Sequence, residues 1–502
     1  MTQSFTLAPR SDFDLADVGR LLSRLCWRVG LLAGVALLMF PELVLAQAPA
    51  VHALYVPKTW KVGAAPLPLN IQIAAGRTAT PTVTVNWQLD DEAPLRKTFT
   101  RNELGDPSDP QLTELGAELR ISAAGEHTFR VWFSDESGAN VLGDTLRVPI
   151  LAMEHSFERH ILLEEFTGAW CGWCPSGMEV VEDLMAAHPG RIVPVMIHNR
   201  DAMSFEEGDL LTNLANAAGF PSAQVDRTTF PGVVAAPAIY RDVWEAATEA
   251  QLRAASRATL SAEVSYNDTT REITVDLSST FLTDFAGMPR FGLHLLEDSM
   301  AYSGQGWDQA NYTNNTPGSR WFGRGATIRD FVHRHVLRAI PGGVRGIAGV
   351  IPEQARKDST YTHRITFARP RGGRVPYLSV VAYVYNETGS NKLKEVFQTV
   401  EVPVVERTGV SRGPAASTIF EAGLAPNPSQ GLTELRFRLD AGQPTRWTLF
   451  DAQGRELRHV DLGTLSAGLH RLPLDLSDLP HSLYFVALTA GGHTHIERLI
   501  VN

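Results

Sequence analysis

Glu-Glu-Phe-Thr-Gly-Ala-Trp-Cys-Gly-Trp-Cys-Pro, residues 164–175, is the stretch that decides how the middle of this chain folds. An apolar run at residues 161–163 precedes it, which is typical of a short buried strand. Apolar side chains at helical spacing follow it over residues 178–188. The two cysteines of the stretch, Cys171 and Cys174, are therefore expected where a strand gives way to a helix.

The start of a helix favours an ionised thiol. Unpaired N–H groups and the positive end of the helix dipole lower the pKa of a thiol that is placed there. Cys171, first in the pair and nearer the expected helix start, would be the attacking sulfur. Cys174 could then resolve the mixed disulfide that this attack produces. The spacing therefore favours a thiol–disulfide exchange pair.

The same pair of cysteines allows two other interpretations. In the loop-entropy model, closing a four-residue loop stabilises a protein by only about 1.9 kcal/mol, against roughly 3 kcal/mol for a fifteen-residue loop. A bridge between Cys171 and Cys174 would be a weak staple, and an inert disulfide stays an open alternative. A metal site is the third interpretation, although the chain has no second cysteine pair to complete one.

The stretch resembles the active site of thioredoxin-type proteins and, more closely, that of the outer membrane protein twenty-eight-related family. The shared features are Trp170 before the first cysteine, the spacing of the pair and the preceding strand. The resemblance implies a thioredoxin-like domain at residues 155–256, in which Glu165 takes the place of a buried acid that relays protons to the second sulfur. Thioredoxins usually have Asp there, and the alternative is an ordinary polar residue at a strand end.

The same resemblance concerns Pro221, which follows a helical pattern over residues 210–218 and Gly219. In thioredoxin-like folds a cis-proline opens the strand that faces the active disulfide, and Pro221 matches that place. A cis X–Pro bond costs only about 0.5–1 kcal/mol relative to trans. A trans-proline that ends the helix is the alternative. Residues 243–252 are expected to close the unit as a helix, with no evident hairpin strand before it.

Charge and the N-terminal pattern predict export. A net charge of −10 excludes an affinity for nucleic acid or an anionic membrane that rests on basic charge. A basic region, a short apolar run and small residues over 1–46 are typical of a cleaved secretory signal. An uncleaved anchor is the alternative, but Glu42 interrupts the apolar run too early for a membrane span. We therefore expect no transmembrane helix in the mature chain, and two of the three cysteines, since Cys26 leaves with the signal.

Alternating apolar and polar residues predict β-sandwiches on both sides of the cysteine unit, as in residues 83–89 and 273–277. The expected fold class is a multidomain α+β protein. Its expected parts are an Ig-like β-sandwich at residues 51–154, the thioredoxin-like α/β domain at 155–256, a second β-sandwich at 259–405, a linker at 407–423 and a C-terminal β-sandwich at 424–502.

The second sandwich contains a long polar and aromatic interruption at residues 302–325. Loops of this length are usually functional or disordered. Trp307, Tyr312 and Trp321 lie there among amides, and their rings could stack on a sugar or a peptide. Packing of the loop on itself is the alternative.

Two histidines close behind this interruption raise the question of a metal. His333 and His335 are two residues apart, so on a strand they would share a face. No third ligand is evident, and a satisfied pair of strand residues is the favoured interpretation. We predict neither a metal nor a cofactor.

The C-terminal stretch resembles the type A sorting domain of type IX secretion. It opens with Pro-Asn-Pro at residues 426–428, contains the Phe-Asp and Gly-Arg turn at 450–455 and ends on an apolar strand. Residues 481–483, His-Ser-Leu, stand where a glycine commonly precedes the tyrosine. The resemblance implies the type IX secretion machinery as a partner, removal of the domain, and a place on the outer membrane surface or outside the cell.

Two functions follow from these observations. The first is a secreted or cell-surface thiol–disulfide oxidoreductase, in which Cys171 attacks, Cys174 resolves, Glu165 moves protons and Pro221 shapes the groove for a client backbone. Its partners would be disulfide-bearing or dithiol client proteins. The second is a surface binding or adhesion protein in which the thioredoxin-like unit is a scaffold between two sandwiches. The first is favoured.

Overall fold

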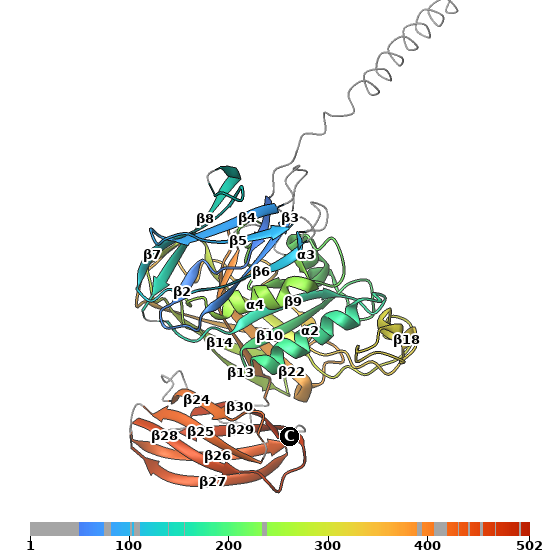
Figure 1. Ribbon diagram of the computed structural model, residues 1–502. Coiled ribbons are helices and arrows are strands. Elements are labelled where there is room, and N and C mark those ends of the chain that lie inside the picture. Colours follow the sequence, from blue (N-terminus) through green and yellow to red (C-terminus); the bar gives the residue numbers. More distant parts are fainter. Residues whose placement is uncertain are drawn as a thin grey trace, which may run out of the picture.

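The computed structural model describes residues 50–501, apart from 75–81, 101–102, 105–110, 139, 155, 233–237, 389–393, 406–418, 430, 440–441, 452–454, 467 and 491–492. The expected signal at 1–46 and most of the expected linker at 407–423 lie outside the described residues. The chain is built mainly of strands in several sheets, with short helices in its middle (Figure 1). The predicted multidomain class with sandwich-like parts is confirmed.

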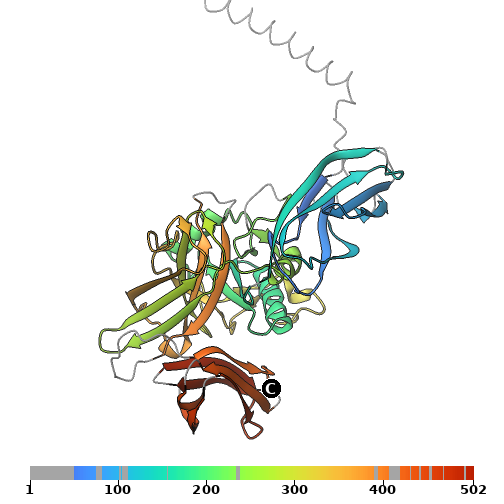
Figure 2. The same ribbon diagram turned by 90° about the vertical axis from the view of Figure 1, so that its left-hand side faces the viewer.

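The N-terminal body is a sandwich of two sheets, drawn in blue to cyan in Figure 2. Their strand orders are β1-β3-β6 and β2-β8-β7-β4-β5. The strands are β1 Ala50–Leu54, β2 Thr59–Lys61, β3 Leu67–Ala74, β4 Thr82–Leu89, β5 Leu95–Thr100, β6 Gln111–Leu119, β7 Gly125–Ser134 and β8 Val141–Met153. Val83, Val85 and Trp87 alternate along β4 and are buried in the core, because successive side chains of a strand point to opposite faces.

The middle of the chain forms one eight-stranded sheet in the order β12-β11-β9-β10-β19-β16-β22-β23. Its strands are β9 Ile161–Thr167, β10 Ile192–His198, β11 Ser222–Val225, β12 Ile239–Tyr240, β16 Pro289–Glu297, β19 Val336–Ala339, β22 Leu378–Asn386 and β23 Glu395–Pro403. Its helical segments are α2 Cys174–Ala187, α3 Glu206–Ala215, α4 Trp244–Leu252 and the short η2 Arg241–Val243. β9 and β10 run parallel, and every residue of both is buried. Strands that are covered on both faces show such continuous burial.

The helices divide between the two faces of this sheet. Leu184 of α2 and Trp244 of α4 share a core with residues 161 and 163 of β9. Leu211 of α3 lies in a different cluster, together with residue 162 of β9 and the two valines of β10, at 193 and 195. Because alternate residues of a strand point to opposite faces, Glu165 lies on the side of α2 and α4 and Glu164 lies on the other side.

This sheet continues across the boundary that the sequence suggested near residues 256–259. β10 pairs with β19 in parallel, with Met196 opposite Val336, and β16, β22 and β23 extend the same sheet. The two expected units therefore share a sheet. The two-residue strand β12 also pairs with β11, so a short extra strand does precede α4.

The second sandwich forms between the far end of this sheet and a three-stranded sheet in the order β13-β14-β21. These strands are β13 Ser261–Asn267, β14 Glu272–Thr280 and β21 Thr360–Ala368. Ile273, Val275 and Leu277 of β14 are buried in the core, as the alternation predicted. The shorter elements are β15 Phe285–Ala286, β17 Gln309–Ala310, η3 Thr313–Asn315, β18 Thr327–Ile328, β20 Gln354–Ala355 and η4 Val375–Tyr377.

The C-terminal body has two further sheets, in the orders β24-β25-β28 and β27-β26-β29-β30, with a core of their own (Figure 1). The strands are β24 Ile419–Ala425, β25 Leu432–Leu439, β26 Gln443–Asp451, β27 Glu456–Leu465, β28 Gly468–Asp475, β29 Ser482–Ala490 and β30 His493–Val501. Among the described residues, no helix has the length and apolar character that crossing a membrane requires.

Candidate functional site

A disulfide between Cys171 and Cys174 closes the turn that joins β9 to α2. α2 begins at Cys174, and Trp173 is its N-cap residue. The sequence analysis expected Cys171 to be the cysteine nearer the helix start, but Cys171 lies in the turn before the helix, and Cys174 is the first helical residue. The reason is that Pro175 occupies the first helical turn, where a missing N–H costs nothing.

Both cysteines are almost completely enclosed. Cys171 is 4% exposed and Cys174 is 3% exposed. Trp170 and Trp173 beside them remain 47% and 46% exposed. The turn therefore presents aromatic side chains to solvent and keeps its sulfurs below the surface.

A segment from far along the chain covers the turn. We call residues 300–333 the cover segment, because Met300 and His333 pair at its base as an isolated β-bridge. The backbone N–H of Tyr312 donates to the carbonyl of Gly172 at 2.8 Å, and Gln309 Nε2 donates to the carbonyl of Cys171 at 2.9 Å. The Tyr312 ring also lies edge-on to Trp173 with the ring centres 5.7 Å apart. These contacts account for much of the enclosure of Cys171.

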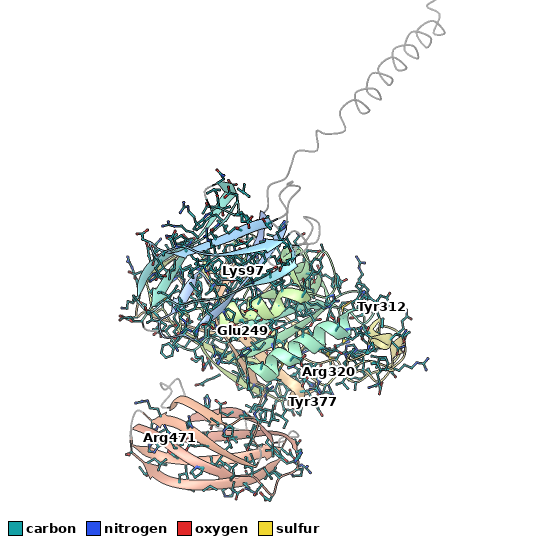
Figure 3. The ribbon with its side chains drawn as sticks, in the orientation of Figure 1. Lys97, Glu249, Tyr312, Arg320, Tyr377 and Arg471 are labelled. Carbon is teal, nitrogen blue, oxygen red and sulfur yellow. A yellow bond between two sulfur atoms is a disulfide. The ribbon has the colours of Figure 1, made fainter. Side chains whose placement is uncertain are left out.

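The cover segment is also attached to α2. Trp321 Nε1 donates to the carbonyl of Pro175 at 3.1 Å, and Ser319 Oγ donates to Glu179 Oε1 at 2.7 Å. The guanidinium of Arg320 pairs with two further carboxylates of α2, those of Glu182 and Asp183. Figure 3 shows Tyr312 and Arg320 on the side of the molecule that carries α2. The segment is therefore fixed to both the turn and the helix that follow β9.

The three aromatic residues that we predicted as possible ligand contacts all lie in the cover segment. Trp307 packs on Tyr302 with the ring centres 4.6 Å apart, and Trp321 packs on Phe331 at 4.8 Å. Tyr312 is 64% exposed and stands over the cysteine turn. Two of the three rings thus pack within the cover segment, and one faces both solvent and the turn.

Glu165 lies under the first turns of α2. A Cβ atom added to Gly177 would come within 2.8 Å of Glu165 Oε1 and 3.0 Å of the Pro221 ring, so this helical glycine permits the close approach of all three. Glu165 is 1% exposed, and burial raises the pKa of its carboxyl group to about 8. Its Oε2 has no hydrogen-bond partner in the described part of the chain. The Phe220–Pro221 peptide bond is cis.

Glu164, the neighbour of Glu165, has a different environment on the opposite face of the sheet. Arg227 donates two hydrogen bonds to its carboxylate, and His294 Nε2 donates a third at 2.9 Å. Burial would raise the pKa of Glu164, but the Arg227 guanidinium and His294 hold it well below its ordinary value. Glu164 is therefore a paired structural anion, whereas Glu165 holds its proton at neutral pH.

A second set of polar groups holds the other end of the turn. Asp201 Oδ2 accepts a hydrogen bond from the backbone N–H of Ala169 at 2.8 Å and another from His198 Nδ1 at 2.6 Å. Burial would raise the pKa of Asp201, but these donors hold it below its ordinary value. Together with Gln309, Asp201 positions the turn, and neither residue was singled out from the sequence. Asp201 lies three residues after the end of the buried strand β10, and that position is the one signal of it in the sequence.

The two histidines do not form a metal site. His333 Nε2 donates to the carbonyl of Trp307 at 2.8 Å, and burial lowers the pKa of His333 to about 4. His335 has a left-handed backbone at φ 51°, and β19 begins only at Val336, so the two rings do not share a face of a strand. Among the described residues, no group of His, Cys, Asp and Glu side chains could hold a metal ion.

Comparison with solved structures gives weak similarity. HBP35 of Porphyromonas gingivalis is 18% identical, with 70% of this chain and 100% of that chain covered and a TM-score of 0.40. A domain of the outer membrane lipoprotein Omp28 from the same organism is 20% identical over 30% of this chain and 92% of that chain, with a TM-score of 0.18. No curated protein matches the chain. At these TM-scores neither structure defines the fold of this protein.

The C-terminal body gives a firmer result. The family model of the secretion system C-terminal sorting domain matches residues 424–502, which are the residues of the predicted sorting domain. The chain therefore carries a sorting domain that implies the type IX secretion machinery, export, and a place on the outer membrane surface or outside the cell, as the sequence predicted.

Proposed function

We propose that this exported protein is a thiol–disulfide oxidoreductase whose reacting groups are Cys171 and Cys174. One observation supports the proposal above all. The disulfide lies at the start of α2, and the same helix packs directly on the buried carboxyl group of Glu165, whose pKa is raised to about 8. A proton carrier is most effective when its pKa lies near those of the groups that it serves. An ordinary thiol has a pKa of about 8.5, which is close to that of Glu165.

In the reduced protein, the Cys171 thiolate attacks one sulfur of a client disulfide, and the other client sulfur leaves as a thiolate. The product is a mixed disulfide between Cys171 and the client. Glu165 in its ionised form, which is the minor form at neutral pH because its pKa is about 8, takes the proton of the Cys174 thiol. The Cys174 thiolate then attacks Cys171 Sγ, which releases the second client sulfur as a thiolate. The two client thiolates then take up two protons, one from Glu165 and one from solvent, so the client gains two electrons and two protons while the protein regains its disulfide and Glu165 its starting charge. The oxidised protein runs the same steps in reverse on a dithiol client.

The positions of the four residues support separate roles for them. Cys171 lies in the turn next to exposed Trp170, so it is the sulfur nearer to a client. Cys174 lies in the helix, where unpaired N–H groups and the helix dipole favour its thiolate at the resolving step. Pro221 lies beside Gly177, three residues after Cys174, on the same side of α2 as Glu165.

The proposal is tested with the reduced protein and a small fluorescent disulfide whose emission rises on reduction. We expect turnover by the wild type and none by Cys171→Ser. Cys174→Ser should instead accumulate a mixed disulfide, visible as an added mass that dithiothreitol removes. Wild-type protein alkylated before the assay serves as the background control. A Cys171→Ser protein as fast as the wild type would reject the assignment.

One observation favours the second candidate, a surface binding protein in which this unit is a scaffold. Both cysteines are enclosed, at 4% and 3% exposure, as in an inert structural disulfide. In that case reduction would require a potential below about −300 mV, which is typical of structural disulfides. A pair that exchanges with glutathione at a higher potential excludes the scaffold interpretation.

A further inference from the structure

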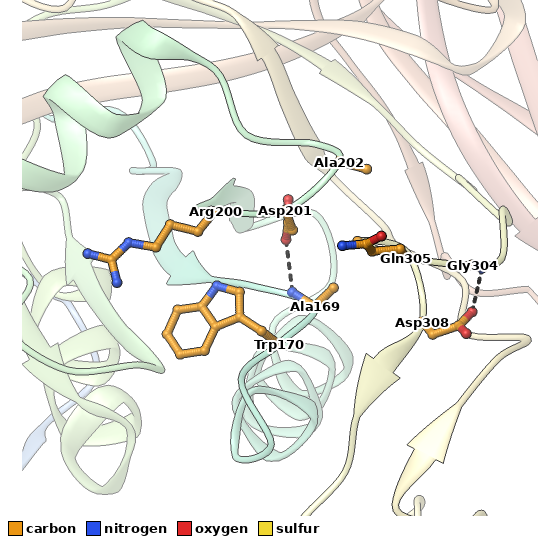
Figure 4. A pocket seen from close by; sticks show the side chains of 9 residues that line it. Ala169, Trp170, Arg200, Asp201, Ala202, Gly304, Gln305 and Asp308 are labelled. Atoms are coloured by element: carbon orange, nitrogen blue, oxygen red, sulfur yellow. Dashed lines mark hydrogen bonds between the residues drawn. The ribbon is translucent and has the colours of Figure 1, made fainter.

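A cavity of about 630 Å³ opens beside the turn that carries the cysteines. Three stretches line it, namely the end of the β9 turn with Trp170, the loop after β10 at residues 200–202, and the start of the cover segment at residues 304–308. Figure 4 shows Trp170 and Arg200 on one side of it and Gln305 and Asp308 on the other. Cys171 does not line the cavity but follows Trp170 directly in the chain, so a molecule bound there lies against the residue that precedes the proposed attacking cysteine. Binding sites for small ligands commonly have this volume.

The cavity lies on the side of the turn that carries Trp170, which is 47% exposed. Beyond Cys171, the turn is covered at Gly172 by Tyr312, and α2 is covered by Trp321 and its neighbours. On the side of Trp170, in contrast, Arg200, Ala202, Gly304 and Gln305 are exposed around the cavity. A polypeptide that brings a sulfur to Cys171 therefore has room for its flanking residues on this side.

The charge of the cavity is uneven. Asp201 is engaged by His198 and by two backbone N–H groups, and Asp308 accepts a hydrogen bond from the backbone N–H of Gly304 at 2.8 Å. The guanidinium of Arg200 makes no hydrogen bond or ion pair with any described residue. Arg200 is thus the basic residue among those that line the cavity, in a protein whose net charge is −10, and Asp308 carries a negative charge on the other side.

The backbone holds Arg200 in a conformation that few residues adopt. Its φ is 54°, in the left-handed region, which costs an ordinary side chain roughly 1–2 kcal/mol. The residues on both sides are fixed, because the Asn199 carbonyl accepts a hydrogen bond from Trp170 Nε1 at 2.6 Å and the Asp201 side chain binds the Ala169 N–H. Unfavourable conformations of this kind persist where the surroundings fix them, and they cluster at functional sites. The guanidinium is therefore carried on a rigid support beside Trp170.

We propose that this cavity binds the client residues that flank the reacting disulfide, and that Arg200 selects a carboxylate, from Asp or Glu, close to the client cysteine. A planar guanidinium forms paired hydrogen bonds with a carboxylate, and the exposed indole of Trp170 covers the aliphatic part of the same side chain. The inference rests on the proposed function, because it names the client chemistry of that site.

The test uses three short disulfide peptides that differ in one residue next to the cysteine, which is Glu, Gln or Lys. At low ionic strength we expect reduced wild-type protein to react with the Glu peptide roughly threefold to tenfold faster than with the Lys peptide. The preference should vanish in Arg200→Ala, reverse in Arg200→Glu and persist at a smaller ratio in Arg200→Lys, because the Lys ammonium keeps the charge but not the paired hydrogen bonds. Arg241→Ala is the matched control, because Arg241 lies against Trp173 and outside the cavity, and it should keep the wild-type preference.

A second measurement separates this inference from the proposed function. The same peptides, labelled with a fluorophore and carrying Ser in place of Cys, are titrated with the oxidised protein, and binding is followed by anisotropy. Selective binding of the Glu peptide that depends on Arg200 supports the cavity, even if exchange is absent and the proposed function fails. Exchange without any preference for charge, or a preference unchanged in Arg200→Ala, overturns the inference and leaves the oxidoreductase. An absence of both binding and exchange overturns both.

Discussion

The raised pKa of Glu165 should make the stability of the folded protein depend on pH, which can be measured without a client protein. Burial raises this pKa from its ordinary 4.5 to about 8, so between these values the folded protein holds a proton that the unfolded chain has lost. The contribution of Glu165 to stability is therefore fully present below pH 4.5 and is lost as the pH rises through 8. The loss amounts to about 1.4 kcal/mol per pH unit, or roughly 5 kcal/mol over the whole range.

Glu165→Gln replaces the protonated carboxyl with a neutral group of the same size and removes this dependence. Because unfolding of a multidomain chain is not a single step, we would follow hydrogen exchange of the β9 amides instead of a global transition. The ratio of wild-type to variant protection should fall about tenfold for each pH unit between pH 5.5 and 7.5. Intrinsic exchange rates cancel in this ratio.

Glu164→Gln is the matched control, one residue away. The folded-state pKa of Glu164 is lowered, so its contribution is present above pH 4.5 and is lost only as the pH falls below that value. Its removal should lower protection by a constant factor between pH 5.5 and 7.5, since Arg227 loses its partner. Parallel pH profiles for wild type and Glu165→Gln would refute the argument, because the carboxyl would then be ionised in the folded protein.

Two further predictions concern packing around the pair. Gly177→Ala should destabilise the protein by about 1–3 kcal/mol, measured by hydrogen exchange of the β9 amides, because the new Cβ meets Glu165. In an open helical site the same change would instead add about 1 kcal/mol of stability, so a more stable variant would contradict the close approach. Tyr312→Ala should speed maleimide labelling of the reduced protein roughly twofold to tenfold, since an aromatic pair over Gly172 is worth about 0.5–1.5 kcal/mol. Phe322→Ala is the control, because it removes another exposed ring of the cover segment, 54% exposed, and its cysteines should react at the wild-type rate. Equal labelling rates for the wild type and both variants would show that Tyr312 does not limit access to the cysteines.

The local parts of the fold were predictable from sequence because they depend on neighbours in the chain. The alternation in β4 and β14 identified buried strands, and the apolar run before residues 164–175 identified β9. The change from strand to helix was expected at the cysteines, but Cys174 and not Cys171 is the residue at the helix start, because Pro175 sets the first turn. The pattern of the C-terminal body was specific enough to locate the sorting domain.

The surroundings of the pair could not be predicted in the same way, because they depend on contacts between distant residues. Gln309 binds the Cys171 carbonyl across 138 positions of sequence, and no periodic pattern records such a contact. The aromatic residues at 302–325 did indicate a special loop, but not that it would lie over the cysteines. Likewise, the pairing of β10 with β19 joins two expected domains through backbone hydrogen bonds, which leave no mark on side-chain pattern.

The central claim is that Cys171 and Cys174 exchange electrons with other thiols. The most direct test is the reduction potential of this pair, measured on the mature chain equilibrated in thiol–disulfide buffers and read by the mass of alkylated protein. We expect a potential above about −300 mV, in the range of catalytic pairs. A pair that is reduced only below this value would contradict it.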